Sequence, residues 1–142
     1  MASNDIFNYA TIAMLLPWAL IILLPRGKYT EQVAFLAVFT FILAAIWVIW
    51  KNIAEGRNEG DLFSLDGLSR FIQNRDMMLA GWLNYLAFSL CAGIWQINDS
   101  REIKLAHLLV IPGLIFTLFA GPIGLLVYFV FRRFKTGAWH LR

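Results

Sequence analysis

The 142-residue chain is too apolar for a soluble domain, since 60% of its residues are hydrophobic, only 15% are charged and its mean hydropathy is +0.66. A soluble domain of this size needs more charge to cover its surface. The net charge of +3 comes from cations that flank apolar runs, which argues against a nucleic-acid partner. The length suits one domain, so we expect residues 1–142 to form a single integral membrane domain.

Four long runs contain no Asp, Glu, Lys or Arg: residues 6–25, 33–50, 77–97 and 105–131. About 20 apolar residues in a helix cross the ~30 Å hydrocarbon layer, where a helix satisfies its own backbone hydrogen bonds. The runs therefore predict four transmembrane helices. Because the connections within the first and last pairs are short, the expected fold is all-α, a four-helix transmembrane bundle of two antiparallel hairpins.

The first run has two interpretations, a cleaved signal peptide or a retained anchor. No positive charge precedes the run, and no small-residue cleavage site follows it at Pro25. These features favour a retained anchor. Pro17 lies inside the run and predicts a kink there.

The middle connection, about residues 51–76, contains a short amphipathic pattern. Asp61 is a plausible N-cap, and the apolar residues after it recur at helical spacing: Leu62, Leu65, Leu68, Phe71 and Ile72. The pattern predicts a helix over about residues 61–73, lying in the membrane interface. Gly67 within the pattern leaves an irregular loop as the alternative.

The distribution of Lys and Arg predicts an orientation. Four spans would place eight of these cations on the side of the termini and the middle connection, and four on the other side. Both termini are therefore expected to be cytoplasmic. No leader rich in Arg and Ser precedes the first span, which favours a bacterial inner (cytoplasmic) membrane or an intracytoplasmic membrane derived from it.

Polar side chains within the predicted third span are candidates for function. Asn84, Tyr85, Ser89 and Gln96 lie there, with Trp82 interpreted as packing between helices. Asn84 and Ser89 are about 140° apart around a helix, so they cannot converge on one small substrate atom. The alternative to function is that each bonds a neighbouring helix.

The predicted fourth span adds a histidine and a stripe of small residues. His107 could shuttle a proton or bind a metal, or it could simply be a solvated imidazole at the interface. With His140 expected on the opposite side, no bis-histidine haem site and no metal site is predicted. Gly113, Thr117 and Gly121 lie at intervals of four residues, which predicts close packing of another helix or of a flat, elongated apolar ligand.

An ordered set of segments resembles the abscisic-acid-deficiency-four-like family of small four-helix membrane proteins. The segments are 67–69, 79–93, 107–112 and 121–126. Plant members of this family are required to form neoxanthin from violaxanthin. The resemblance therefore implies a helical membrane fold and a connection with carotenoids.

The third helix departs from the family at two positions. The family has a run of the form Trp-x-His-Leu/Tyr-Leu-Ala-x-Asp, in which Trp82, Leu86 and Ala87 match. Asn84 stands in the place of the histidine and Ser89 in the place of the aspartate. Opening an epoxide to an allene requires proton removal and delivery, and neither replacement titrates near neutral pH.

Two functions follow, with a third that has less support. The first is a non-catalytic membrane subunit that packs against a larger, pigment-bearing, photosynthetic membrane complex, with a carotenoid or other pigment between its helices. The second is a xanthophyll-modifying enzyme in which His107 or Tyr85 performs the proton transfers. A small transporter is the third, but it lacks charges within its spans.

Overall fold

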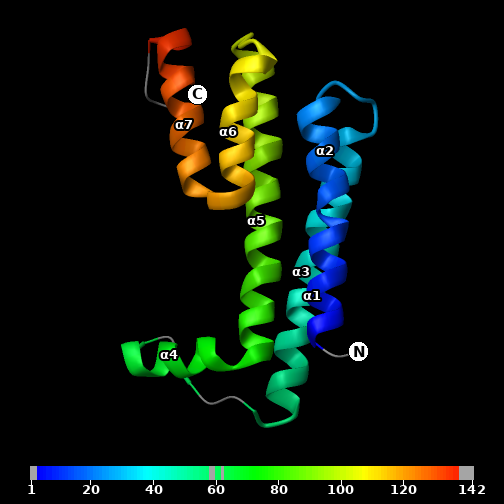
Figure 1. The fold of residues 1–142 in the computed structure, drawn as a ribbon, viewed down its shortest axis with the longest axis vertical. Coiled ribbons are helices and arrows are strands. Elements are labelled where there is room, and N and C mark those ends of the chain that lie inside the picture. Colours follow the sequence, from blue (N-terminus) through cyan, green and yellow to red (C-terminus); the bar gives the residue numbers. More distant parts are fainter. Residues whose placement is uncertain (1–2, 58–59, 62, 138–142) are drawn as a thin grey trace.

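The computed structural model describes residues 3–57, 60–61 and 63–137, and these residues form helices and connections without a strand (Figure 1). Three helical segments are long and apolar enough to cross a membrane: 3–23, 30–54 and 75–102. The chain is thus an all-helical membrane protein. The helices are α1 (Ser3–Ala13), α2 (Leu15–Leu23), α3 (Thr30–Ala54), α4 (Leu65–Gln73), α5 (Arg75–Glu102), α6 (His107–Ala120) and α7 (Pro122–Thr136).

The first membrane segment is interrupted near its middle. α1 ends at Ala13, four residues before Pro17, and α2 begins at Leu15. Proline has no N–H to donate to the carbonyl four residues earlier, and its ring crowds that carbonyl. The break therefore lies where the missing hydrogen bond of Pro17 would have been, at Ala13, in agreement with the predicted kink.

The predicted fourth span is two short helices rather than one long helix. α6 and α7 fold back on each other at Gly121 (Figure 1). Its backbone angles, φ 39° and ψ −94°, are ones that residues with a side chain rarely adopt. With 14 and 15 residues, each is about 21–23 Å long at ~1.5 Å per residue, less than the ~30 Å hydrocarbon layer. Pro122 starts α7, a position that proline favours. A hairpin therefore replaces the continuous helix expected over residues 105–131.

The hairpin brings the end of α7 beside the end of α5. Arg132 Nε donates to Asp99 Oδ2 at 2.8 Å, whereas the start of α1 lies at the opposite end of the molecule (Figure 1). The start of α1 and the end of α7 thus lie at opposite ends of the described part of the molecule. Among the described residues, seven cations lie at the end of the molecule where α5 ends, which we call the α5 end, and four lie at the opposite end, where α1 starts. The seven are Arg26, Lys28, Arg101, Lys104, Arg132, Arg133 and Lys135, and the four are Lys51, Arg57, Arg70 and Arg75.

A short helix is present in the middle connection as α4, which extends sideways from the start of α5 (Figure 1). Its N-cap is Ser64, whose Oγ accepts the Gly67 N–H at 3.0 Å, and not Asp61 as expected. Asp61 instead accepts the backbone N–H groups of Phe63 and Ser64 at 2.8 Å. These hydrogen bonds lower the pKa of Asp61 from its ordinary value.

Gly67 is required by the turn before α4. A Cβ at this position would lie well inside 3.0 Å of the Asp61 carboxylate, so the residue that argued against a helix instead permits its start. The apolar residues Leu65 and Ile72 remain exposed, as expected of a helix in the interface. Leu62, part of the predicted pattern, lies outside the described residues.

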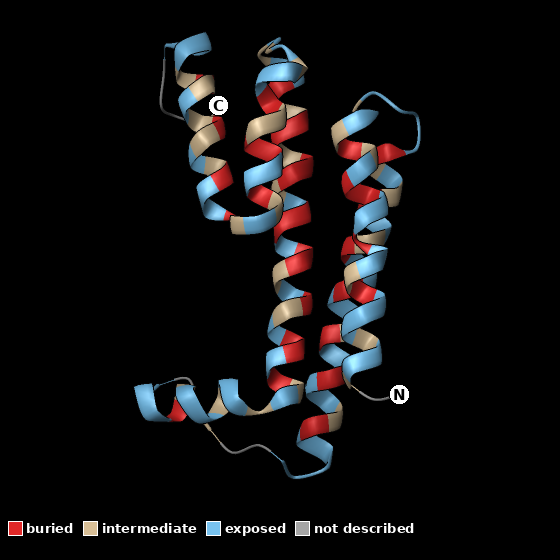
Figure 2. Ribbon diagram, in the orientation of Figure 1, coloured by how far each residue is buried: buried red, intermediate tan, exposed pale blue. Residues whose placement is uncertain are grey.

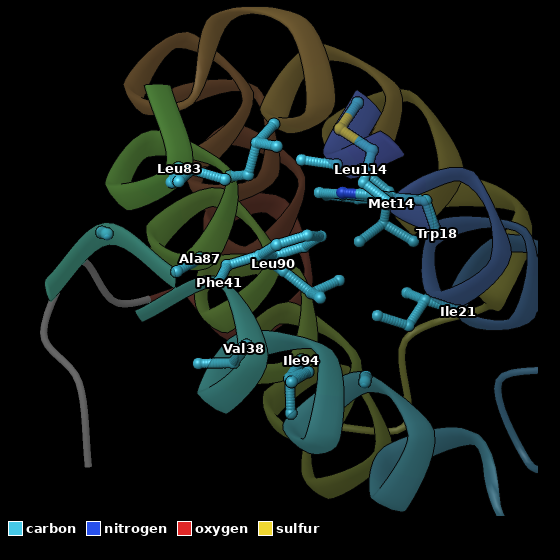
Figure 3. Packing of buried hydrophobic residues seen from close by; sticks show 14 of the residues in the cluster. Met14, Trp18, Ile21, Val38, Phe41, Leu83, Ala87, Leu90, Ile94 and Leu114 are labelled. Atoms are coloured by element: carbon cyan, nitrogen blue, oxygen red, sulfur yellow. The ribbon is translucent and has the colours of Figure 1, made fainter. Parts of the chain in front are cut away.

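The core lies where α2, α3, α5 and α6 meet (Figure 2). Trp18 is only 2% exposed and packs on Gly93, where a Cβ would lie 3.0 Å from Trp18 Cη2. Leu90 and Leu114 complete the same cluster (Figure 3). α5 thus contacts each of the other helices.

Candidate functional site

An apolar pocket lies between α1 and the first turns of α5. Its volume is about 320 Å³, at the lower end of the ~300–1,000 Å³ range typical of ligand sites. We call it the aromatic pocket. Its walls are Phe7, Met78, Leu79 and Trp82, and its polar rim is Ser3, Asn4 and Arg75.

Three aromatic rings connect this pocket to the tip of the α6–α7 hairpin. The Phe7 and Trp82 centroids are 5.7 Å apart, and Trp82 stacks on Tyr85 at 5.5 Å with an interplanar angle of 23°. Tyr85 Oη donates to the carbonyl of Leu118 at 3.2 Å, and a Cβ at Gly121 would lie 3.5 Å from the Tyr85 ring. The structure thus brings Trp82, Tyr85 and Gly121 together, three of the residues that the sequence singled out.

The indole N–H of Trp82 is buried and has no hydrogen-bond acceptor among the described residues. Buried donors are nearly always paired, because an unpaired one loses its water without replacement. Trp82, which lines the aromatic pocket, therefore has a buried donor that is unpaired among the described residues.

No carboxylate or imidazole of the described residues lines the aromatic pocket. Among the described residues, Arg75 is the only charged residue in the lining of the pocket, and its Nη2 donates to Asn4 Oδ1. General acid–base chemistry needs a group that exchanges a proton near the working pH. The lining is suited to holding a ligand, with apolar walls and a few polar groups at one end.

One face of α5 is exposed along much of the helix. We call it the open face, defined by the exposed residues Met78, Gly81, Asn84, Phe88 and Cys91. The Asn84 side chain makes no hydrogen bond to any described residue, and a Cβ at Gly81 would meet nothing within 4 Å. An exposed carboxamide in the middle of a membrane-crossing helix is costly in lipid alone.

Ser89, the other departure from the family run, lies on a different side of α5. It is 1% exposed, and its Oγ donates to the carbonyl of Leu86 at 3.0 Å within the same helix. Asn84 and Ser89 are therefore not brought together, as their spacing predicted.

The stripe of small residues on α6 is filled by neighbouring helices. Thr117 Oγ1 accepts from Gln96 Nε2 at 2.6 Å and donates to the Gly113 carbonyl at 2.8 Å. A Cβ at Gly113 would lie 3.1 Å from Tyr128 Cβ, and one at Gly124 would lie inside 3.0 Å of the Thr117 backbone nitrogen. Of the stripe, only Gly121 is next to the aromatic residues of the site.

His107 lies away from the aromatic pocket, at the start of α6. Its Nε2 is 2.7 Å from the carbonyl oxygen of Ile22, a contact that joins α6 to α2. His140 lies outside the described residues. Among the residues that the structure describes, no group of three His, Cys, Asp or Glu side chains could hold a metal ion.

A buried charged cluster was missed by the sequence reasoning. Asp99 Oδ2 accepts from Tyr128 Oη at 2.6 Å and from Arg132 Nε at 2.8 Å. The side chains of Arg132 and Asp99 are 4% and 10% exposed. Residues 98–104 were expected to form a loop, whereas α5 continues to Glu102. The sequence contained one indication of this cluster: Tyr128 and Arg132 are four residues apart, so they lie on the same face of a helix.

Comparison with known proteins gives one family. No curated protein and no solved structure matches the chain. Residues 5–128 match the family described as ABA DEFICIENT 4-like, which is most of the chain and extends from the first turn of α1 into α7. The chain therefore belongs to the ABA DEFICIENT 4-like family.

Proposed function

We propose that this protein is a non-catalytic membrane subunit connected with carotenoid metabolism, which packs against a larger, pigment-bearing membrane complex as a single integral membrane domain. The observation that carries the proposal is the lining of the aromatic pocket. It offers the apolar aromatic side chains of Phe7 and Trp82 but, among the described residues, no carboxylate or imidazole. Family membership supports the connection with carotenoids.

The ligand that best fits the aromatic pocket is an elongated, apolar pigment with an oxygenated end group. Phe7 and Trp82 give the aromatic pocket apolar aromatic walls against which a conjugated chain can lie. Ser3 and Asn4 provide polar groups at the rim that can bind an oxygen of the pigment. A xanthophyll combines these two properties.

The open face of α5 is the proposed contact with a partner subunit. Gly81 allows close approach of another helix, and Asn84 has hydrogen-bonding capacity that no described residue uses. A partner helix with a polar side chain at this depth would cover both. The face is long enough for such a contact, since it extends from Met78 to Cys91.

The orientation follows from the cations in their observed positions. The α5 end, with seven of the described Lys and Arg residues, is proposed to face the cytoplasm, and the start of α1 the other side. The membrane is proposed to be a bacterial inner membrane or one derived from it.

Replacing Trp82 by leucine should remove the bound pigment. The exchange removes the largest aromatic ring of the pocket wall, so we expect the pigment occupancy of protein extracted with mild detergent to fall about tenfold. Absorbance spectra and mass spectrometry of the extract measure the occupancy. Trp50→Leu is the control, because Trp50 is 71% exposed on α3, and it should keep the pigment. A wild-type protein that purifies alone and colourless would contradict the proposal.

Replacing Asn84 by leucine should weaken the partner contact without unfolding the protein. Hydrogen bonds between membrane helices contribute roughly 0.6 kcal/mol on average, so we expect about a threefold loss of co-purifying subunit. Thr40→Leu on the exposed surface of α3 is the control and should retain the subunit. Equal recovery from both variants would exclude the open face as the contact.

Family membership also favours a second candidate, a xanthophyll-modifying enzyme. Two groups near the aromatic pocket could move a proton: the Tyr85 phenol, which stacks on Trp82, and the Asp76 carboxylate, which accepts a hydrogen bond from Ser3 at the rim. Incubation of the purified protein with violaxanthin decides between the two. Conversion that is lost in Tyr85→Phe would establish the enzyme, whereas binding without conversion would support the subunit.

A further inference from the structure

A second pocket lies at the opposite end of α5 from the aromatic pocket. Its volume is about 340 Å³, and it is bounded by the connection from α2 to α3, the last turns of α5 and the start of α6. We call it the basic pocket. Its lining residues are Pro25, Arg26, Ile97, Ser100, Arg101, Lys104, Leu105, Ala106 and His107.

Two of its three Arg and Lys side chains have no anionic partner. Arg101 forms an ion pair with Glu31 and also donates to the carbonyl of Pro25, which fixes one wall. Arg26 and Lys104 form no ion pair or hydrogen bond with a described residue through their side chains. The lining of the pocket thus includes two positively charged side chains that no carboxylate of the described residues neutralises.

The remaining walls combine an apolar surface with backbone donors. Ile97 and Leu105 line the apolar side. α6 begins here after Ala106 with no side-chain cap and no acidic residue in its first turn. The first N–H groups of a helix have no acceptor within it and carry partial positive charge. These N–H groups add partial positive charge to the full charges of Arg26 and Lys104.

The position of the pocket fits a phospholipid. It opens where apolar helices end and cationic loops begin, the depth at which lipid phosphates lie. Basic pockets between membrane helices bind anionic lipid headgroups, and the apolar wall can accept the upper part of an acyl chain. Two free cations and no free carboxylate in the lining select an anion over a zwitterion.

We propose that the basic pocket binds the phosphate of an anionic phospholipid, held by Arg26 and Lys104 with the start of α6 behind them. The phosphodiester lies between the two cations, and the acyl chains follow Ile97 and Leu105 into the bilayer. This site is independent of the pigment or partner proposed above, because it uses none of the residues of the aromatic pocket or the open face.

The test measures phosphatidylglycerol binding to the full-length protein in phosphatidylcholine nanodiscs. Lipids that remain bound after transfer to detergent are counted by native mass spectrometry as the phosphatidylglycerol fraction is raised. Arg26→Gln/Lys104→Gln should weaken binding about 30-fold, roughly fivefold for each cation. Lys51→Gln/Arg70→Gln, at the other end of the molecule, removes the same charge and should change binding less than twofold.

Equal weakening in both double variants would overturn the site, since the effect would then reflect net charge alone. No weakening in the first variant would overturn it as well. A parallel titration with inorganic phosphate distinguishes the source of the anion. Competition by millimolar phosphate at constant ionic strength would overturn the lipid and assign the pocket to free phosphate. Circular dichroism confirms that both double variants retain the helix content of the parent.

Discussion

Asp99→Ala should lower the free energy of unfolding by about 3–5 kcal/mol, because it leaves the Arg132 guanidinium buried without its carboxylate. Asp99 also accepts the Tyr128 hydroxyl, so the substitution removes both polar contacts that join α7 to α5 in this cluster. We expect α7 to detach from α5 before the remainder of the protein unfolds. Unfolding in SDS, followed by circular dichroism and Trp95 fluorescence, measures the change, since Trp95 packs edge-on against Tyr128 at 5.6 Å.

Two further variants separate the buried charge from its position. Glu102→Ala, at the exposed last residue of α5, should leave stability nearly unchanged. Asp99→Leu/Arg132→Met should recover part of the loss, because replacing a buried pair by apolar residues is often close to neutral. A single Asp99→Ala variant as stable as the parent would show that the cluster does not hold the hairpin in place.

Gly124→Ala should destabilise the hairpin by about 1–3 kcal/mol, a large effect for one methyl group. The new Cβ would lie inside 3.0 Å of the Thr117 backbone nitrogen and of its Cα. Backbone atoms cannot rotate away, so α6 and α7 must separate. Separation would also weaken the hydrogen bond that Thr117 accepts from Gln96.

Gly81→Ala is the matched control, because a Cβ there meets nothing within 4 Å. Alanine is the better helix former, so this variant should gain roughly 0.5–1 kcal/mol. The two substitutions add the same atom to glycines in helices of the same protein. If both gained stability equally, the close approach of α6 and α7 would be wrong.

The first three membrane segments could be predicted from the sequence, whereas the hairpin could not. Length without charge identifies apolar helices, and residues 105–131 satisfied this criterion as well as the other three runs. The criterion cannot distinguish one crossing from two half-crossings. The Gly121–Pro122 pair contained the information, but a kink and a reversal have the same sequence signal until φ and ψ at Gly121 are known.

The candidate site was predicted in part. Trp82, Tyr85 and Gly121 came from helical spacing and small-residue patterns, and they meet in the structure. Phe7 had no signal, since its contact with Trp82 depends on how α1 and α5 pack across 75 residues of sequence. Asp99 was missed because a charged residue was assumed to mark the end of a membrane helix, whereas α5 continues past Asp99 to Glu102.

The central claim is that the last apolar run turns back inside the membrane. Single cysteines at Lys28, Glu55 and Lys135, in a Cys91→Ser background, report the side of each position when intact vesicles are treated with an impermeant maleimide. The account predicts that Lys135→Cys and Lys28→Cys label from the same side and Glu55→Cys from the other. Labelling of Lys135→Cys together with Glu55→Cys would mean a fourth full crossing and would contradict it.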